Sequence, residues 1–262
     1  MAPLLSVVVP AYNEQRRLQA TLDAILTFLA AQPFDSEVIV VDDGSTDTTV
    51  QIAETLGATH PRLRVIRNDH RGKGYTVRTG MLLAQGKYVL FTDADLAVPM
   101  DEWAKLAPAF DSGYDIAIGS REGLGARRLG EPRYRHFMGR IFNGVVRLIA
   151  LGGIQDTQCG FKAFRREVAQ HLFNSVQLYG ADAKVVHGAA VTAFDVEVLF
   201  LARKFDYRIK EVPVTWRYGA ETKVDPIRDS WRNFSDVLRV RWNDLRGRYA
   251  VMPALPKKTP SK

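Results

Sequence analysis

The feature that most constrains this chain is residues 87–92 (KYVLFT), a short apolar run that leads directly into Asp93-Ala94-Asp95. The run is rich in β-favouring residues and follows Gly86, which predicts a buried strand of a parallel sheet. Ligands bind at the carboxyl ends of such strands, and two carboxylates one residue apart repel each other unless a cation lies between them. The pair therefore predicts a divalent cation that also binds phosphate oxygens of a ligand. Alone, however, an Asp-x-Asp pattern is more typical of a solvated turn. The rest of the sequence has to distinguish a metal site from such a turn.

Strand-like and helix-like segments alternate through the first 120 residues. Further strands are predicted at 5–10, 38–41, 63–66 and 115–121, with amphipathic helices between them, such as the one carrying Leu18, Leu22 and Ile25. This alternation predicts an α/β fold with a Rossmann-like, mostly parallel sheet flanked by helices on both faces. Polar side chains follow five strands: Tyr12 and Glu14, Asp42 and Asp43, Arg71 and Lys73, Asp93 and Asp95, and Arg121. Because these strand ends should meet at one edge, they favour a functional crevice over solvated turns.

Charge is divided unevenly along the 262 residues, whose net charge is +7. Residues 1–120 carry 10 basic and 15 acidic side chains, whereas 121–147 carry seven and two, and 203–248 carry twelve and seven. An acidic front half and a basic rear half predict a polyanionic partner, either nucleic acid or an anionic membrane surface. The sequence predicts no signal peptide and no transmembrane span, and its single cysteine, Cys159, suits a reducing compartment.

Several motifs, in this order and spacing, resemble those of family 2 glycosyltransferases, and specifically the polyprenyl-phosphate (dolichyl-phosphate) hexose synthases. They are PAYNE (10–14), VVDDGSTD (40–47), GKG (72–74), DADL (93–96), GSR (119–121) and the turn DTQCGFK (156–162). The resemblance covers residues 5 to about 248. It implies a GT-A fold and an inverting transfer of a hexose from a nucleotide sugar to polyprenyl or dolichyl phosphate, with Mg²⁺ or Mn²⁺ as cofactor. Gln158-Cys159 resembles the glucosyl enzymes more than the mannosyl ones, which favours UDP-glucose over GDP-mannose.

The resemblance also implies roles for individual residues. Asp93 and Asp95 match the metal motif, with Asp95 as the stronger candidate for a direct ligand, and Arg121 and Arg135 match arginines that meet the acceptor phosphate. Asp156 either contacts a sugar hydroxyl or holds an arginine; with Asp95, Arg121 and Arg135 it completes the predicted catalytic set. The predicted donor-binding residues are Pro10, Ala11, Tyr12, Glu14, Asp42, Asp43, Lys73, Asp93, Ala94 and Lys223.

This chain departs from close relatives at two positions. Ala97 stands where they carry a glutamine after the metal motif, and Gly139 stands where they carry a serine near the acceptor phosphate. The resemblance therefore implies fewer side-chain contacts to the metal and to the acceptor than in those relatives.

Two basic, amphipathic segments occupy the rear half. Residues 131–152 predict a helix with a broad apolar face, and 226–250 predict a second helix with Trp231, Phe234, Leu238 and Trp242 among arginines. The first pattern fits either a core helix or a helix in the membrane interface, and the resemblance favours the interface because the acceptor is a lipid. The second, with aromatic residues among arginines, fits either single-stranded nucleic acid or a bilayer surface. We therefore predict a catalytic domain at 1–225, a helix at 226–250, a disordered tail at 251–262, and a peripheral or monotopic protein at the cytoplasmic face of a membrane.

Other functions stay open at this point. A sugar-phosphate nucleotidylyltransferase would carry a glycine-rich loop after the first strand, where this chain has PAYNE. A nucleic-acid-binding module would use the basic rear half, but no RNA or DNA motif accompanies it, and we expect no nucleic-acid partner. A glycosyltransferase with a protein, glycan or small-molecule acceptor would keep the same fold.

Overall fold

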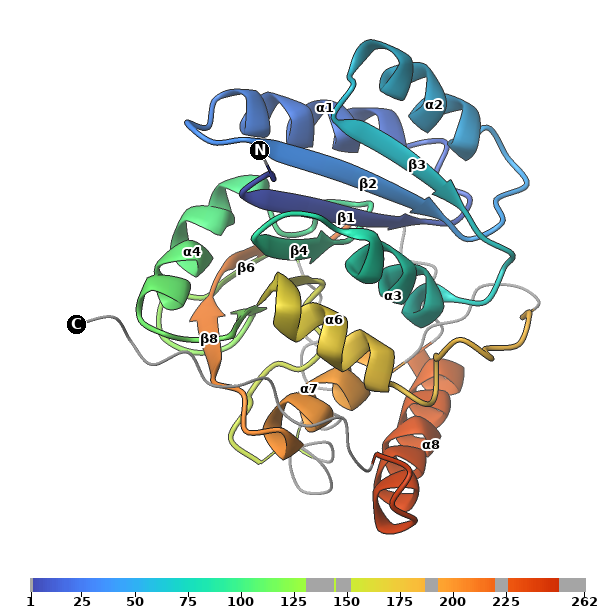
Figure 1. Ribbon diagram of the computed structural model, residues 1–262, viewed down its shortest axis with the longest axis vertical. Helices are drawn as coiled ribbons and strands as arrows, with labels where there is room; N and C mark the ends of the chain where they lie inside the picture. The colour runs from blue at the N-terminus through green and yellow to red at the C-terminus, as the bar shows by residue number, and fades with distance from the viewer. Residues whose placement is uncertain (1, 131–143, 145–151, 187–192, 220–225, 250–262) are drawn as a thin grey trace.

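A computed structural model of the protein describes residues 2–130, 144, 152–186, 193–219 and 226–249 (Figure 1). Its centre is a seven-stranded sheet with the strand order β3-β2-β1-β4-β7-β5-β8. These strands are β1 (Leu5–Ala11), β2 (Ser36–Asp42), β3 (Leu63–Arg67), β4 (Tyr88–Thr92), β5 (Ile116–Ser120), β7 (Phe161–Arg165) and β8 (Ile209–Pro213). A two-stranded parallel ribbon joins β6 (Arg127–Leu129) to β9 (Thr215–Arg217).

Helices cover both faces of the sheet, as the sequence predicts. They are α1 (Leu18–Ala30), α2 (Thr49–Thr59), α3 (Lys73–Leu83), α4 (Trp103–Asp111), which follows the short 3-10 helix η1 (Met100–Glu102), α6 (Arg166–Ser175), α7 (Phe194–Lys204) and α8 (Pro226–Leu245). Side chains of β1 alternate between the faces: Val7 and Val9 belong to the core formed with α1, α2 and α4, whereas Val8 belongs to the core formed with α3, α6 and α7. Two apolar cores, one on each face, therefore stabilise the sheet.

The sheet is mostly parallel, which confirms the prediction, but β7 runs antiparallel to both β4 and β5. The sequence does not predict β7, because Lys162 and Arg165 interrupt its apolar residues. The predicted turn at 156–162 is therefore too long, since Phe161 and Lys162 already belong to this strand. β8, which ends at Pro213, lies at the edge of the sheet, where a proline is tolerated.

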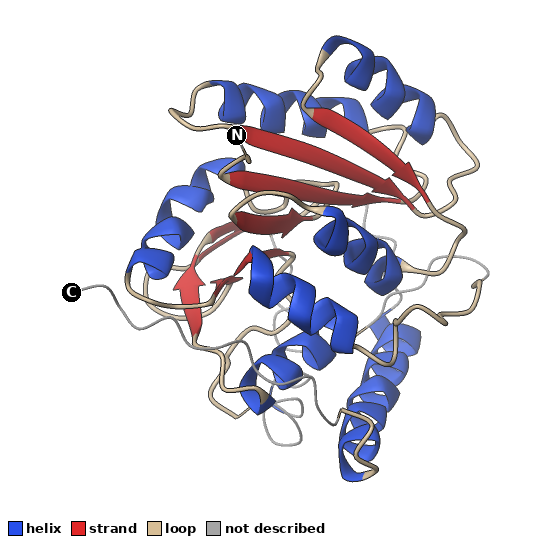
Figure 2. Cartoon of the chain, in the orientation of Figure 1, coloured by secondary structure: helices blue, strands red, loops and turns tan. Residues whose placement is uncertain are grey.

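The strand order reverses beside β1, which pairs with β2 on one side and β4 on the other. The arrowheads of β1, β2 and β3 point to one common edge in Figure 2. In an open α/β sheet, the crevice at such a reversal is where a ligand binds. The loops after β1, β2 and β4 carry the predicted donor-binding and metal-binding residues to this crevice.

The predicted helix at 226–250 corresponds to α8, which packs against α7 and places Val237 and Val240 in the core. The predicted helix at 131–152 and the tail at 251–262 fall almost wholly outside the described residues. Among the residues that the structure describes, no helix is both long and apolar enough to cross a bilayer.

Candidate active site

The loops after β1 and β2 hold each other at the sheet edge. The backbone N–H of Asn13 donates to Ser45 Oγ (2.9 Å), and the Asn13 side-chain oxygen accepts from the Thr46 N–H (2.8 Å). The Glu14 N–H donates to Thr49 Oγ1 (2.7 Å). Asn13 has a φ of 53°, a left-handed conformation that asparagine tolerates better than most residues. These contacts fix the relative position of the PAYNE and DDGS motifs.

Asp42 has one satisfied and one unsatisfied carboxylate oxygen. Its Oδ2 accepts hydrogen bonds from the N–H groups of Gly44 and Ser45, both at 3.0 Å. Its Oδ1 has no hydrogen-bond partner in the described part of the chain, although the residue is only 3% exposed. A buried acceptor without a partner is costly, so a ligand that donates a hydrogen bond here would stabilise the site.

Asp43, one residue further, holds the loop before α3. Its carboxylate accepts from the backbone N–H groups of Arg71 (2.9 Å) and Gly72 (3.0 Å) and lies 2.8 Å from His70 Nδ1. The His70 ring stacks on Tyr12, with 4.0 Å between ring centroids and 4° between ring planes. Asp43 therefore organises the loop and, through His70, supports the Tyr12 ring.

Asp93 and Asp95 follow β4 and face different partners. Asp93 Oδ1 lies 2.6 Å from Lys73 Nζ, whereas Asp95 Oδ1 accepts from the Ala97 N–H (3.0 Å) and Asp95 Oδ2 lies 4.0 Å from Arg17. Burial and the Asp93 charge raise the pKa of Asp95 above its ordinary value. Burial alone would lower the pKa of Lys73, but the carboxylates of Asp93, Asp195 and Asp95 raise it overall.

These two acids fit a divalent cation with an incomplete protein shell. Within the described ranges, no cluster of three or more His, Cys, Asp or Glu side chains could hold a metal ion. Mg²⁺ and similar ions commonly take one or two carboxylates and complete their shell with water and substrate phosphate oxygens. Burial first, and the Asp93 charge second, raise the pKa of Asp95, and a cation beside the two carboxylates would favour its ionised form.

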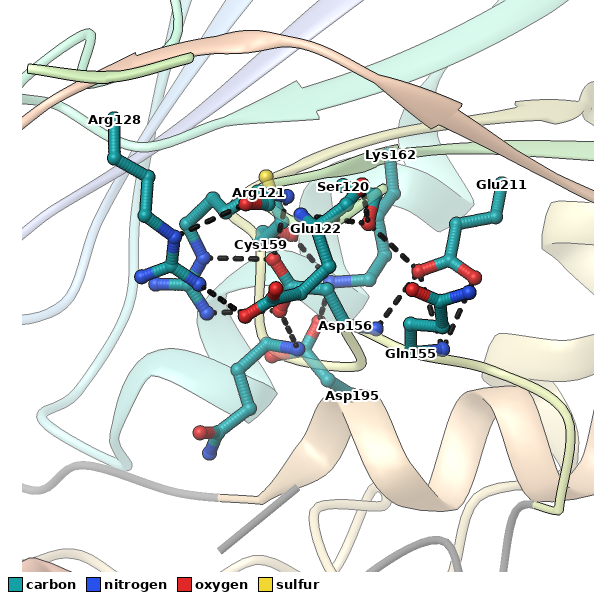
Figure 3. Close-up of polar contacts among 11 residues, drawn as sticks. Ser120, Arg121, Glu122, Arg128, Gln155, Asp156, Cys159, Lys162, Asp195 and Glu211 are labelled. Carbon is teal, nitrogen blue, oxygen red and sulfur yellow. Dashed lines mark hydrogen bonds and ion pairs between the residues drawn. The ribbon is translucent and has the colours of Figure 1, made fainter. Parts of the chain in front are cut away.

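Arg121, directly after β5, is clamped by Asp156 (Figure 3). The guanidinium donates Nε–H to Asp156 Oδ2 (2.7 Å) and Nη2–H to Oδ1 (2.8 Å), and the Arg121 backbone N–H also donates to Oδ2 (2.8 Å). Burial would raise the pKa of Asp156, but this arginine lowers it to about 2. Of the two roles left open for Asp156, the structure therefore shows that it holds an arginine.

A second set of contacts holds the clamp in place (Figure 3). Glu211 of β8 accepts from the Ser120 hydroxyl (2.7 Å) and from the Asp156 backbone N–H (2.7 Å). Arg128 donates its Nε–H to the Arg121 carbonyl (3.0 Å) and pairs with Glu122 (2.8 Å). Both sides of the clamp are thus fixed to the sheet and to the loop after β5.

Lys162 lies beneath the crevice and is 1% exposed. Its Nζ donates to the Cys159 carbonyl (2.5 Å) and to Asp195 Oδ1 of α7 (2.6 Å) (Figure 3). Burial raises the pKa of Asp195, against the effect of Lys162 and Lys73. Asp195, in the first turn of α7, thus pairs with the buried Lys162 of β7.

Cys159 packs as a small buried residue between these groups. It is a buried free thiol, and burial raises its pKa to about 12. The charges of Asp156, Arg121, Lys162 and Asp93 all act on it. The metal motif and the arginine clamp therefore lie close together around one buried position.

The structure brings most predicted site residues to this edge. Pro10 and Ala11 are buried at the end of β1, and the Ala94 carbonyl accepts from Thr21 Oγ1 (2.6 Å). Two predicted contacts, Arg135 and Lys223, lie outside the described residues. The described chain preceding Lys223 does reach the site, because a Cβ placed on Gly219 would lie 3.9 Å from Asp95 Oδ2.

Sequence analysis misses four residues that shape the site: His70, Gly160, Lys162 and Glu211. Gly160 is required sterically, since a Cβ there would lie 1.9 Å from Asp93 Oδ2. Lys162 and Glu211 belong to strands whose pairing only the fold reveals. A usable signal existed for Gly160 and Lys162, because both belong to the DTQCGFK motif.

Comparisons with known proteins show the family of this chain. Residues 6–173 match the family described as Glycosyl transferase family 2. The dolichyl-phosphate beta-glucosyltransferase of Drosophila melanogaster is 39% identical over 255 residues, which cover 91% of this chain and 74% of that protein. The enzyme of the same name from Dictyostelium discoideum is 34% identical over 94% of this chain and 76% of its own length.

Among solved structures, glucosyl-3-phosphoglycerate synthase from Mycobacterium tuberculosis, in complex with Mn²⁺, uridine-diphosphate and glucosyl-3-phosphoglycerate, has a TM-score of 0.58. It is 20% identical, and the match covers 96% of this chain and 82% of that one. This similarity shows the shared fold.

Proposed function

The chain belongs to glycosyl transferase family 2, and from this premise we propose that it transfers glucose from UDP-glucose to a polyprenyl phosphate such as dolichyl phosphate, with inversion at the sugar. The observation that carries the proposal is the juxtaposition of an acid pair, Asp93 and Asp95, with a carboxylate-clamped arginine, Arg121. The acids suit a metal-bound diphosphate, and the arginine suits a second phosphate. The names of the relatives and the Gln158-Cys159 sequence favour glucose.

The donor nucleotide would occupy the loops after β1 and β2. The unsatisfied Asp42 Oδ1 would accept the ring N–H of the base, and the supported Tyr12 ring would stack on it. Both uracil and guanine carry such an N–H, so this contact does not select between them. Lys73 and, from outside the described residues, Lys223 would meet the diphosphate, with Glu14, Asp43 and the backbone of Pro10, Ala11 and Ala94 lining the donor site.

Asp95, assisted by Asp93, would hold Mg²⁺ or Mn²⁺. When bound, such an ion neutralises the charge that develops on the departing nucleoside diphosphate. Lys73, whose Nζ lies 2.6 Å from Asp93 Oδ1, would bind a phosphate oxygen of the donor beside these carboxylates.

Arg121 would orient the acceptor phosphate for attack on the anomeric carbon. A guanidinium carries five N–H donors, and Asp156 accepts from two of them while fixing the plane of the group. The second pKa of a phosphate monoester is roughly 6, so the attacking oxygen is ionised at neutral pH and no general base is required. Arg135 is the proposed second arginine for the same phosphate.

We also propose that α8 contacts an anionic membrane at the cytoplasmic face. Leu238, Trp242 and Leu245 are exposed on this helix, and the Arg246 guanidinium lies 4.4 Å from the Trp242 ring centroid. Aromatic and basic side chains together suit the level of lipid headgroups. The free thiol of Cys159 is compatible with a reducing compartment.

The test is a donor and acceptor matrix. The protein is incubated with UDP-glucose or GDP-mannose, with Mg²⁺ or Mn²⁺, and with a polyprenyl phosphate in vesicles, and the lipid product is identified by mass. A hexosyl-phosphoryl lipid formed from UDP-glucose is the expected result. If the lipid product forms only with GDP-mannose, the proposed donor is wrong. If hexose is transferred only to a water-soluble acceptor, the proposed lipid acceptor is wrong.

A further inference from the structure

The loop after Arg121 carries a leucine that is wholly exposed. Leu124 is 100% exposed, more than any other large hydrophobic side chain in the described part of the protein. It lies between Gly123 and Gly125, both with a φ of 92°, a left-handed conformation that favours glycine. The Ala126 N–H donates to the Gly123 carbonyl (3.2 Å) and closes the turn around Leu124. The chain therefore presents this side chain at the apex of a tight turn.

The base of this loop is fixed. Arg128 pairs with Glu122 (2.8 Å) and donates to the Arg121 carbonyl (3.0 Å), while the Arg127 N–H donates to the Val214 carbonyl (3.1 Å). Ion pairs and backbone hydrogen bonds thus close the loop on both sides. The exposure of Leu124 is therefore built into the loop and is not a consequence of a loose chain end.

The surroundings of the tip are basic and apolar. Arg127 and Leu129, on the strand that follows, are both exposed. Of the other two arginines at 121–130, Arg121 pairs with Asp156 and Arg128 with Glu122, so the basic side chain presented beside the tip is Arg127. An acidic protein surface would attract the arginine but would offer the leucine no apolar partner, and the same holds for water. An anionic bilayer matches both features, since its headgroups attract arginine and its acyl chains accept leucine.

We propose that Leu124 is a membrane-inserting tip that enters the acyl-chain region of an anionic bilayer and sets Arg121 at the level of the lipid phosphates. The inference rests on the proposed function in one respect: an acceptor phosphate carried by a membrane lipid has to reach Arg121, three residues from the tip. It adds a second membrane contact, separate in sequence from α8.

Vesicle binding of the full chain tests this without any turnover. Leu124→Ser is compared with wild type on vesicles of phosphatidylcholine with phosphatidylglycerol, and Leu83→Ser, a change at another exposed leucine (43%) at the end of α3, is the matched control. We expect the partition constant to fall roughly tenfold for Leu124→Ser and to stay unchanged for Leu83→Ser. Equal binding of wild type and Leu124→Ser would overturn the inference.

Two further measurements locate the contact. In a Leu124→Trp variant, the added tryptophan emission should shift to the blue with vesicles and be quenched by bromine on the lipid acyl chains; an unshifted, unquenched emission would contradict insertion. Thermal unfolding and UDP binding should match wild type in both Leu124 variants, since Leu124 lacks packing to lose.

The activity arm separates this inference from the proposed function. Leu124→Ser should lose transfer to a long-chain polyprenyl phosphate in vesicles but keep transfer to a short-chain, water-soluble one. If wild type glucosylates neither acceptor, the proposed function fails, whereas the vesicle-binding result still decides the role of Leu124.

Discussion

The two halves of the candidate active site are built by different means. In the nucleotide half, Asp42 and Asp43 are held mainly by backbone N–H groups, those around Asp42 only two or three residues away in sequence. In the half that we propose for the acceptor, Arg121, half-buried, pairs with the buried Asp156, and the buried Lys162 pairs with the buried Asp195, across 35 and 33 residues of sequence. Backbone-held acids tolerate loss of a side chain nearby, whereas a buried ion pair leaves an uncompensated charge when one partner is removed. The two halves should therefore respond differently to substitution.

The largest effect should come from the residue between the halves, Asp95. Asp95→Ala should reduce transfer by at least about a thousandfold, because a carboxylate that stabilises the leaving group through a metal acts in the transition state. Initial rates over a Mg²⁺ titration measure this, with Asp23→Ala, a change at an exposed acid of α1, as the control. A variant that turns over normally after chelation of the metal would remove Asp95 from this role.

Arg121→Lys tests the acceptor half while keeping the charge. Lysine cannot reproduce the two parallel hydrogen bonds to Asp156, so the KM for the acceptor should rise roughly tenfold to a hundredfold, while UDP binding stays near wild type. Steady-state kinetics with each substrate varied and calorimetry with UDP provide the two readouts. A selective loss of UDP affinity would move Arg121 to the nucleotide half.

The same contrast explains what could be predicted from the sequence. The nucleotide half follows from local patterns, because Asp42 ends the apolar strand β2, Asp43 follows it, and Asp93 and Asp95 come within three residues of the end of β4. The acceptor half depends on β7, which enters between β4 and β5 from a distant part of the chain and carries Lys162. From the sequence alone, Lys162 would be predicted to lie at the surface, because lysine is rarely buried without an acidic partner. Its partner, Asp195, is brought to it only by the packing of α7.

The stability of the protein should depend on the ion pair between Lys162 and Asp195. Lys162→Met leaves Asp195 buried without its cation and should lower the free energy of unfolding by about 3–5 kcal/mol. Lys162→Met with Asp195→Leu should recover much of that loss, because both charges are then gone. Urea unfolding of the single and double variants gives the coupling free energy, and Arg62→Ala, which breaks an exposed pair with Asp35, should cost less than about 1 kcal/mol. Additive losses at Lys162 and Asp195 would show that the two charges do not depend on each other.

The Arg121–Asp156 clamp should make the free energy of unfolding depend on pH. The pKa of Asp156 is lowered from 3.8 to about 2, so the folded state favours its ionised form, and this stabilisation is present above the unfolded value and is lost as pH falls through the folded one. The difference in unfolding free energy between wild type and Asp156→Asn should contain a pH-dependent part of roughly 2 kcal/mol. That part should be constant from neutral pH to about pH 5 and decline below about pH 4. A difference that instead changes near neutral pH would indicate another titrating group.

The smallest effect should come from substitution of Cys159, although this residue lies near charged side chains of both halves, such as Asp93 and Asp156. Burial raises the pKa of its thiol to about 12, so almost no thiolate is present at neutral pH, and the side chain is enclosed. The native protein should therefore react with an aromatic disulfide reagent only as fast as it unfolds, while the denatured protein reacts at once. Cys159→Ala should change transfer by less than about twofold, because the Cys159 group that binds Lys162 is its backbone carbonyl, which alanine retains. Rapid labelling of the native chain, or a large loss of activity in Cys159→Ala, would show that the thiol itself takes part in the acceptor half.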